Sequence, residues 1–363
     1  MRVLHYVDAF KLAWMEPWFG LLKELEKLGV ENVVLCRGGG VLESELKGHG
    51  FRGFFYTPPA QWLPALAFGV GRVIKDVRPD LIHTRLSAAA MLGGWWGRHL
   101  KVPVLSTFDK YPKARYYRNS DVLIGCSSAV TEYVKSLSLP GAKAVETILN
   151  PIEPKRYLRD DAVRADFRRK MGVADDEVVV LGMGRFVGWK AWDDYLRAIA
   201  LLSDLGHFRF WLVGGGDEGR RDQEGALREL AKELGIAERV KFFPFADDVR
   251  PWLWGADVFV QPSKEPEGFS LMLAEAMAAG LPPVTTAIGG ALDIVRDGVS
   301  GLLVPPQSPV DLASALRRMA DAEFRAKLAH GARRSAAEVS AGRVAAQTFE
   351  LYERVLSTMK KGS

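Results

Sequence analysis

The segment Lys264–Gly280, KEPEGFSLMLAEAMAAG, holds the clearest set of residues able to do chemistry. A Glu-Gly-Phe turn leads directly into a helix-like stretch, whose first residues are expected to present unpaired N–H groups. These residues are Gly268, Phe269, Ser270 and Leu271. A helix start of this kind can hold a diphosphate, and the carboxylates of Glu267 and Glu275 can accept hydrogen bonds from sugar hydroxyls. The alternative is a well-capped surface helix whose glutamates merely suit the helix dipole.

A second candidate loop, Gly182–Lys190 (GMGRFVGWK), comes directly after a predicted strand. Its two cations, Arg185 and Lys190, could neutralise a diphosphate and stabilise it as it leaves. Gly184 opens the loop and is grouped with the expected donor-binding residues. The alternative is a pair of solvated surface cations.

Taken together, these segments resemble the retaining GT-B glycosyltransferases of family 4. Glu267 and Glu275 match that family's E-x7-E motif, and Ala276–Val284 resembles the stretch that follows it. Ala287–Gly290 and Ile294–Val304 (IVRDGVSGLLV) are similar to a further glycine-containing segment of the family. The resemblance spans essentially the whole chain and is closest in the second half.

The resemblance implies a role for each donor-side residue. Glu267 would contact the donor sugar, Glu275 would contact the ribose, and the backbone of the helix start would cradle the distal phosphate. The loop Phe243–Asp248 (FPFADD) resembles the one that receives the base, which assigns Phe243 and Phe245 to donor binding. Leu212–Gly216 (LVGGG) resembles a turn along the donor site, where Gly215 and Gly216 would permit close backbone approach.

The first half departs from the family pattern at several positions. Ala13–Glu16 (AWME) stands where many members have a glycine pair, so Trp14 is assigned to acceptor binding instead. In Leu105–Asp109 (LSTFD), Phe108 replaces a histidine, and Asp109 is the candidate to contact and orient the acceptor hydroxyl. His83 matches the first histidine of a family motif and Arg85 replaces the second. Both are acceptor-side candidates, although His83 equally suits a structural, hydrogen-bonded histidine.

Aromatic and basic residues are interleaved in Tyr111–Arg118 (YPKARYYR), which includes the acceptor-side candidates Lys113 and Arg115. Further apolar-aromatic segments occur at Trp14–Phe19, Trp62–Phe68 and Trp95–Trp96. Cations beside exposed aromatics suit an anionic membrane surface or a phosphorylated, lipid-linked acceptor. Nucleic acid is not expected, because no recognition motif is present. The alternative places these aromatic residues in the core.

The elements that must position these residues alternate between strand and helix. This rhythm predicts an α/β fold, and the resemblance implies a GT-B architecture, two Rossmann-like domains facing a central cleft. We expect an acceptor-binding domain over 1–155, a nucleotide-sugar-binding domain over 156–340, and a helix over 341–363 that packs back toward the first domain. Two prolines in Asn150–Tyr157 and the polar stretch that runs to Asp176 predict the linker.

Bulk properties are those of a globular protein, with 48% hydrophobic and 26% charged residues in 363. Cys36 and Cys126 lack the spacing of a zinc site or a disulfide framework. The formal charge is +6 over residues 1–150 and −1 over the rest, so either the first half meets an anionic partner or its surface is simply solvated. With no signal peptide or membrane span recognised, a cytoplasmic location with peripheral contact at the inner face of the membrane is expected.

The sequence therefore predicts a retaining glycosyltransferase that moves a sugar from a nucleotide-diphosphate donor to a glycan or lipid-linked acceptor in lipopolysaccharide or envelope polysaccharide synthesis. No cofactor and no metal are expected, because no D-x-D motif lies in a suitable context. Two alternatives remain, a non-hydrolysing sugar-nucleotide epimerase and a non-catalytic nucleotide-sugar-binding module.

Overall fold

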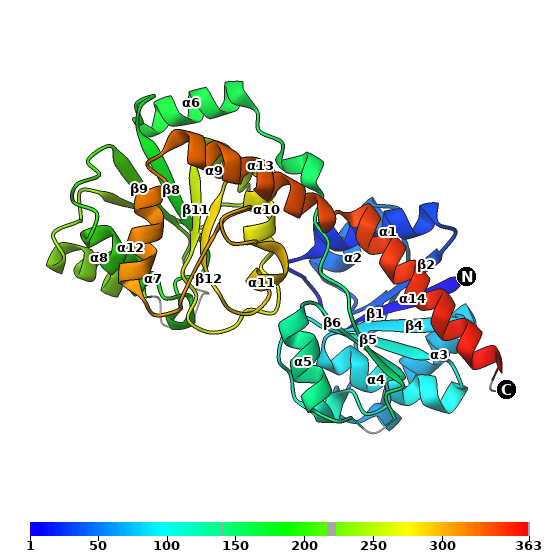
Figure 1. The fold of residues 1–363 in the computed structure, drawn as a ribbon. Coiled ribbons are helices and arrows are strands. Elements are labelled where there is room, and N and C mark those ends of the chain that lie inside the picture. The colour runs from blue at the N-terminus through cyan, green and yellow to red at the C-terminus, as the bar shows by residue number, and fades with distance from the viewer. Residues whose placement is uncertain (140, 216–222, 362–363) are drawn as a thin grey trace. The chain divides into compact units, whose positions relative to one another are not determined.

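The computed structural model describes residues 1–139, 141–215 and 223–361. The chain divides into two compact units (Figure 1): unit 1 is Met1–Ile152 with Val339–Ser363, and unit 2 is Glu153–Glu338. The sequence placed these boundaries at 155/156 and 340/341. Within the described ranges, no helix combines the length and apolar character needed to cross a bilayer.

Unit 1 is built on a seven-stranded parallel sheet in the order β3-β2-β1-β4-β5-β6-β7. The chain direction across the sheet reverses between β1 and β4, and such switch points are where open α/β sheets bind ligands, outside the carboxyl ends of the strands. The strands are β1 (Arg2–Val7), β2 (Glu31–Cys36), β3 (Arg52–Phe55), β4 (Leu81–Arg85), β5 (Val104–Phe108), β6 (Val122–Gly125) and β7 (Ala144–Thr147).

Helices cover both faces of this sheet because successive strand residues point to opposite sides. Val3 and Val7 of β1 join a core with α1, α2 and α14, whereas Leu4 and Tyr6 join a second core with α3 and α4. The helix α14 returns from the end of the chain and packs against α1. The helices are α1 (Met15–Lys27), α2 (Val41–Gly48), η1 (Pro64–Leu66), α3 (Phe68–Val77), α4 (Ser87–Leu100), η2 (Ala114–Tyr116), α5 (Ser128–Ser136) and α14 (Ala341–Lys361), where η denotes a short 3₁₀ helix.

Unit 2 contains a six-stranded parallel sheet in the order β10-β9-β8-β11-β12-β13. Its switch point lies between β8 and β11, so the loops that follow these two strands emerge side by side. The strands are β8 (Val178–Met183), β9 (Phe208–Val213), β10 (Val240–Phe243), β11 (Val258–Gln261), β12 (Pro283–Thr286) and β13 (Leu302–Val304).

Helices form a layer on each face of the second sheet as well. α7 and α12 pack together on one side, while α6 packs with α9 and α10 packs with α13 (Figure 1). The helices are η3 (Pro154–Tyr157), α6 (Asp161–Met171), η4 (Gly188–Lys190), α7 (Trp192–Ala200), α8 (Glu224–Glu233), α9 (Arg250–Gly255), α10 (Leu271–Ala279), α11 (Ala291–Ile294), α12 (Pro309–Arg318) and α13 (Ala322–Glu338).

One expectation about the elements was wrong, and one helix was missed. The polar stretch to Asp176, interpreted as linker, contains helix α6, whose Arg164 and Arg168 bind Asp257 of unit 2. The helix was not recognised in the sequence because its charged residues attach it to the rest of unit 2 through ion pairs, and it has no apolar stripe. Helix α13 was not predicted either, since Ala and Gly supply much of its buried face.

Candidate active site

An ion pair between Lys190 and Glu267 lies at the carboxyl edge of the unit 2 sheet. Lys190 ends η4, which follows β8, and Glu267 lies in the loop between β11 and α10. Lys190 Nζ is 2.7 Å from Glu267 Oε1, and the two side chains are only 10% and 15% exposed. Ser263 Oγ donates to the same oxygen at 2.6 Å. Two residues predicted from separate motifs therefore meet in one partly buried centre, and Ser263 is a third member that the sequence did not single out.

Helix α10 begins beside this pair with a well-formed cap. Ser270 is the buried N-cap residue, and its hydroxyl accepts from the Leu273 N–H at 3.3 Å and donates to Gln261 Oε1 at 2.6 Å. The predicted phosphate-binding residues Gly268, Phe269 and Leu271 precede or begin the helix. The helix dipole therefore places partial positive charge on the same loop that carries Glu267.

A glycine pair holds the Glu267 turn in place. The Gly290 N–H donates to the Glu267 carbonyl at 3.0 Å. Gly289 has a φ of +58°, and a Cβ there would collide with the backbone of Glu267, while one on Gly290 would collide with Gly268 O. The sequence indicated these glycines only through the family resemblance. Their structural task is to let the two turns approach closely.

The loop after β8 brings two cations to one aromatic ring. Arg185 is exposed, with its guanidinium carbon 5.7 Å from the Trp189 ring centre, and Lys190 Nζ is 4.8 Å from the same centre. Trp189 was not predicted, although a Trp beside a Lys in a loop after a strand is a usable signal. Gly184 starts the loop with a φ of +153°.

The glycine turn after β9 packs against this loop. A Cβ on Gly214 would collide with Gly184 O, and the Phe186 N–H donates to Gly215 O at 3.1 Å. Gly215 thus supports the Arg185 loop through its carbonyl. Gly216 lies outside the described residues.

Glu275 occupies a different environment from Glu267. It lies in the middle of α10, and Tyr157 Oη donates to its Oε1 at 2.7 Å. Burial raises the pKa of Glu275 to about 7, opposed by the Tyr157 hydrogen bond and the Arg156 charge. The raised pKa means that this carboxyl changes charge near neutrality. Tyr157, from η3, was not predicted as a site residue.

Phe243 and Phe245 lie in different environments. Phe243 ends β10 and contacts the Trp252 ring at 4.7 Å and the Trp211 ring at 6.1 Å, so it belongs to an aromatic cluster. Phe245 is 75% exposed. Of the two predicted base contacts, Phe245 is the side chain that presents an open face to solvent.

In unit 1, Arg85, Asp109 and Asn150 form a polar centre at the carboxyl ends of β4 and β5. Arg85 Nη1 is 2.9 Å from Asp109 Oδ1 and 3.0 Å from Asn150 Oδ1. The Arg85 and Asp109 side chains are 8% and 11% exposed. Asp109 Oδ2 is buried without a hydrogen-bond partner, which is unusual and costly for a carboxylate oxygen.

Two further features mark this centre. Trp14, the N-cap residue of α1, lies over the Arg85 guanidinium at 4.9 Å. Leu86, directly after Arg85, has φ +73° and ψ 149°, a backbone conformation that side-chain-bearing residues rarely adopt. Such strain persists where surrounding structure imposes it and is common at functional sites.

His83 lies within β4 and both of its ring nitrogens have partners. Nδ1 is 2.5 Å from Tyr352 Oη of α14, and Nε2 is 2.7 Å from Thr107 Oγ1. Burial, reinforced by His5 and Arg85, holds the pKa of His83 well below its usual value. These contacts are those of the structural interpretation, in which His83 ties α14 to the sheet as a neutral ring.

A second buried polar group, Asp8, was missed at the end of β1. Arg37 binds it through Nε at 2.8 Å and Nη2 at 2.9 Å, and Gln61 Nε2 donates to it at 3.0 Å. Burial raises the pKa of Asp8, and the Arg37 contacts oppose this. A polar residue directly after a strand is a signal that could have identified it.

An exposed apolar patch lies near the predicted basic segment of unit 1. Its large exposed side chains are Trp62, Leu63, Leu66 and Phe68, at 57%, 55%, 47% and 64% exposure. The Trp62 ring is 5.4 Å from the Tyr116 ring. Lys113 and Arg115 are exposed beside Tyr116, and Arg115 Nη2 donates to the Tyr116 hydroxyl at 2.7 Å.

One grouping of possible metal ligands lies in the described part of the chain. Glu16, Glu45 and His49 could bring ligand atoms within 4.8 Å of one another. Lys23 Nζ lies 3.1 Å from His49 Nδ1, so a cation already occupies one imidazole nitrogen. This group shares no residue with the centres described above.

Comparison with known proteins gives two family matches. Residues 177–322 match the family described as glycosyl transferases group 1, and residues 18–156 match glycosyltransferase family 4. Each match covers most of one half of the chain.

Relatives agree with these matches. A D-inositol 3-phosphate glycosyltransferase from Thermomonospora curvata is 36% identical over 53% of this chain, but the chain spans only 46% of its length. The lipopolysaccharide core biosynthesis glycosyltransferase LpsE from Rhizobium meliloti is 29% identical over 85% of this chain and 86% of LpsE. A crystal structure of Anabaena HepE in complex with UDP matches with a TM-score of 0.86 and 22% identity, covering 98% of this chain and 100% of that one.

Proposed function

The chain belongs to the group 1 glycosyltransferases, and on this premise we propose that it transfers a sugar from a nucleoside-diphosphate donor with retention of anomeric configuration. The acceptor is a glycan or a lipid-linked sugar of envelope polysaccharide or lipopolysaccharide synthesis. The observation that carries the proposal is the Lys190–Glu267 pair, 2.7 Å apart at the switch-point edge of the unit 2 sheet and beside the start of α10.

The donor is held by opposite charges in neighbouring positions. Lys190 and Arg185 take the diphosphate, together with backbone N–H groups at the start of α10. Glu267 accepts hydrogen bonds from hydroxyls of the donor sugar, and Glu275 accepts from the ribose. Phe245 offers its exposed ring to the base.

Transfer then depends on stabilising the leaving group. The bond between the anomeric carbon and the diphosphate oxygen breaks as the acceptor hydroxyl forms a new bond on the same face. The proton of that hydroxyl passes to the departing phosphate oxygen. Negative charge develops on the diphosphate, where Lys190, Arg185 and the helix start are already oriented, so little reorganisation is required.

No metal is assigned to this reaction. Two side-chain cations and a helix dipole supply the positive charge that a divalent ion would otherwise bring to the diphosphate. We therefore propose that transfer is independent of added divalent cations.

The acceptor is assigned to unit 1. Asp109 Oδ2 is a buried carboxylate oxygen without a donor, and an acceptor hydroxyl would supply one. Arg85 and Asn150 fix the carboxylate through Oδ1 and the strained Leu86 adjoins them. Asp109→Asn should raise KM for the acceptor and leave donor affinity unchanged; the opposite pattern would remove this role.

The proposed lipid-linked acceptor accounts for the exposed patch of Trp62, Leu63, Leu66 and Phe68. Exposed aromatic and aliphatic side chains beside cations suit the interface of an anionic membrane. Peripheral contact of unit 1 with the inner face of the membrane is therefore part of the proposal. Flotation with anionic vesicles tests it, and equal recovery with neutral vesicles would count against it.

Donor binding and turnover test the central proposal. Nucleoside diphosphates of uridine, guanosine and adenosine should raise the melting temperature selectively for one base, because a ligand of the native state stabilises it. Labelled donors with and without acceptor then separate the alternatives. Product formed without acceptor would indicate an epimerase, and binding without any product would indicate a non-catalytic module.

A further inference from the structure

Unit 2 has a cavity on the edge of the sheet opposite the donor residues. It measures about 300 Å³ and is bordered by Asp257, which precedes β11, and by Gly280–Pro282, which precede β12. Because the strands are parallel, these residues lie at the amino ends of strands whose carboxyl ends carry the Lys190–Glu267 pair. The cavity is therefore separate from the donor site.

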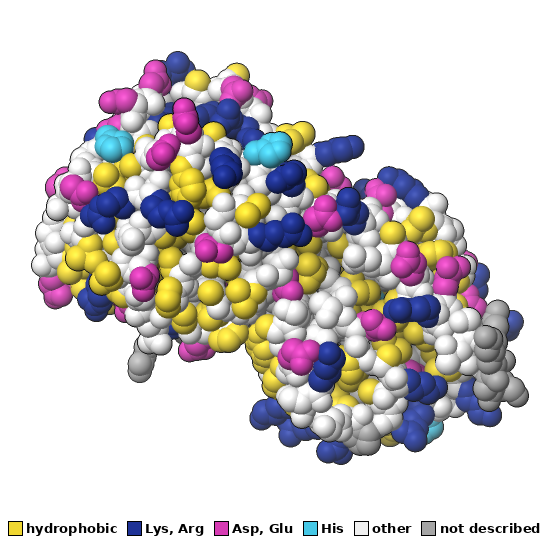
Figure 2. Space-filling view, in the orientation of Figure 1, with side chains coloured by type: hydrophobic (Ala, Val, Ile, Leu, Met, Phe, Trp, Pro, Cys, Tyr) yellow, Lys and Arg dark blue, Asp and Glu magenta, His cyan; other side chains and the backbone are white. Residues whose placement is uncertain are grey.

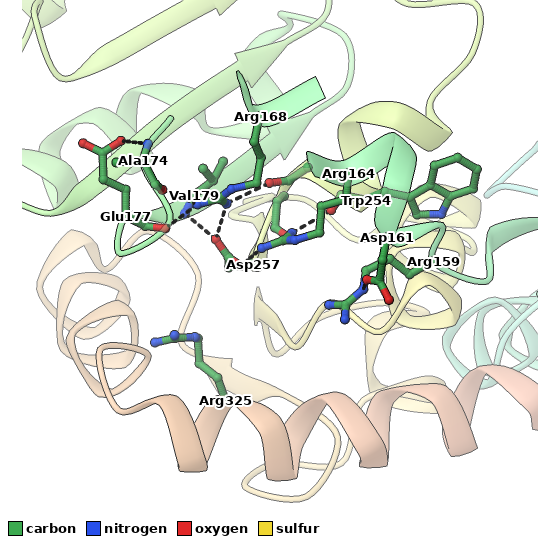
Figure 3. Close-up of polar contacts among 12 residues, drawn as sticks. Arg159, Asp161, Arg164, Arg168, Ala174, Glu177, Val179, Trp254, Asp257 and Arg325 are labelled. Atoms are coloured by element: carbon green, nitrogen blue, oxygen red, sulfur yellow. Dashed lines mark hydrogen bonds and ion pairs between the residues drawn. The ribbon is translucent and has the colours of Figure 1, made fainter. Parts of the chain in front are cut away.

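Three arginines line this cavity, from two parts of the chain. Arg159 precedes α6, and Arg325 and Arg333 lie about two turns apart on α13, so they share a face of the helix. Figure 3 shows Arg159 and Arg325 on opposite sides of the region below Asp257, with the Arg325 guanidinium turned away from Arg159. In Figure 2, Lys and Arg side chains gather along the part of unit 2 over which α13 runs.

The carboxylate in the lining, Asp257, is already neutralised. Arg164 Nη2 contacts its Oδ1 at 2.6 Å, and Arg168 Nη1 contacts its Oδ2 at 3.0 Å (Figure 3). Both arginines also donate to backbone carbonyls, including Trp254 O, Ala256 O, Ala174 O and Glu177 O. Arg164 and Arg168 therefore serve the fold, and Asp257 does not offset the charge of the three lining arginines.

Those three arginines keep donors for a ligand. Arg325 Nη1 donates to Ala320 O at 3.1 Å and to Met319 O, which fixes the side chain and leaves its other N–H groups. Arg159 pairs with Asp161, whose side chain is 78% exposed, and an ion pair in water binds weakly. Arg333 lies against Gly280, where a Cβ would collide with its guanidinium.

The lining also limits what the cavity can hold. Apart from the charged residues, the described lining consists of Gly280, Leu281, Pro282 and alanines, and none of these described residues has an aromatic ring to stack on a base. Guanidinium groups recognise phosphate oxygens with paired, directional N–H donors. We propose that this cavity binds a compact phosphate-bearing group, carried by either a soluble phosphate ester or a phospholipid headgroup. This inference does not depend on the proposed glycosyl transfer.

Calorimetric titration at constant ionic strength tests the proposal, with glycerol 1-phosphate as the soluble probe. Vesicles of phosphatidylglycerol, against phosphatidylcholine, form the lipid arm. Arg333→Gln should weaken binding of the responding probe about tenfold, the scale of one charge-assisted hydrogen bond. Arg334→Gln is the matched control, because this exposed neighbour on α13 removes the same charge without lining the cavity.

Arg159→Gln gives a second variant from a different element, in case Arg333→Gln disturbs the end of α10. A response to glycerol 1-phosphate identifies a soluble ester as the ligand, and a response to phosphatidylglycerol vesicles alone identifies a headgroup. Either result supports the proposal if Arg333→Gln or Arg159→Gln weakens it while Arg334→Gln does not. Absence of binding in both arms, or equal loss in all three variants, would overturn it.

Discussion

Replacing Lys190 by alanine is the most direct perturbation of the proposed chemistry. The Lys190 side chain is 10% exposed, so the change removes a positive charge from a partly buried place while Glu267 keeps its hydrogen bond from Ser263. Two effects follow, one on the stability of unit 2 and one on the leaving group. The structure allows each to be estimated separately.

The stability effect should be moderate. Breaking a fully buried ion pair by removing one partner costs about 3–5 kcal/mol. Here the side chains are 10% and 15% exposed and Glu267 keeps the Ser263 hydrogen bond, so a loss of about 2–3 kcal/mol is expected. The effect on transfer should be a fall of about 10²–10³ in kcat, the scale seen when one donor to a developing negative charge is removed.

Glu267→Gln is the comparison that assigns these losses. It keeps the side-chain shape and an oxygen for Ser263 but removes the negative charge, so Lys190 loses its counter-ion and becomes free for phosphate. Affinity for the responding nucleoside diphosphate should therefore fall in Lys190→Ala and be maintained or rise in Glu267→Gln. Titration calorimetry measures both affinities, and circular dichroism melts measure the stability losses.

The reasoning fails if Lys190→Ala binds the nucleoside diphosphate as tightly as the unchanged protein. It also fails if the two variants lose affinity equally, because Lys190 would then act only by holding Glu267. Near-normal kcat in Lys190→Ala would remove its role in stabilising the leaving group, whatever the affinity.

Three further predictions follow from particular residues. Gly289→Ala should destabilise the protein by more than the ~1–2 kcal/mol of left-handed backbone strain, because its Cβ also meets the Glu267 backbone. Gly298→Ala is the control in denaturant melts, since Gly298 has a φ of +68° but a Cβ there would meet nothing within 4 Å. Equal losses of stability in the two variants would contradict this prediction. The pKa of Glu275 is raised from 4.5 to about 7 in the folded state, so its contribution to stability falls as the pH rises from about 4.5 through 7. Plotted against pH between 5 and 8, the stability of Glu275→Gln should therefore show a flatter slope than that of the unchanged protein. An unchanged slope would contradict this prediction. Chelation by EDTA should leave the transfer rate unchanged, and restoration of a lost rate by Mg²⁺ or Mn²⁺ would show that Lys190 and Arg185 do not suffice.

Much of the fold could be predicted from apolar runs. The strand Arg2–Val7 and the helix Leu271–Ala279 can be recognised in the sequence, because each is a largely apolar run that ends before a polar residue or a glycine. The misses have physical causes. α6 is attached to its unit by Arg164 and Arg168, and such ion pairs leave no hydrophobic period to detect.

For the candidate active site, the sequence predicted the motifs but not the contacts between their residues. The sequence assigned Lys190 and Glu267 to one donor site, and the structure adds that they pair directly, through the Glu267 oxygen that also accepts from Ser263. No spacing rule connects residues 77 positions apart, because their approach is set by the order of β8 and β11 in the sheet. The buried Asp109 Oδ2 is likewise visible only in three dimensions.

The ion pair between Lys190 and Glu267 explains how two opposite charges are tolerated in a partly buried site before a donor binds. An isolated charge there would be costly, whereas Lys190 and Glu267 neutralise each other until a donor arrives. In the proposed binding mode, a complete nucleotide sugar replaces both partners at once, with the diphosphate on Lys190 and sugar hydroxyls on Glu267. A nucleotide without its sugar replaces only the partner of Lys190, so Glu267 is left as a partly buried charge without a counter-ion. On the proposed binding mode, the pair therefore favours the intact donor over the spent nucleotide.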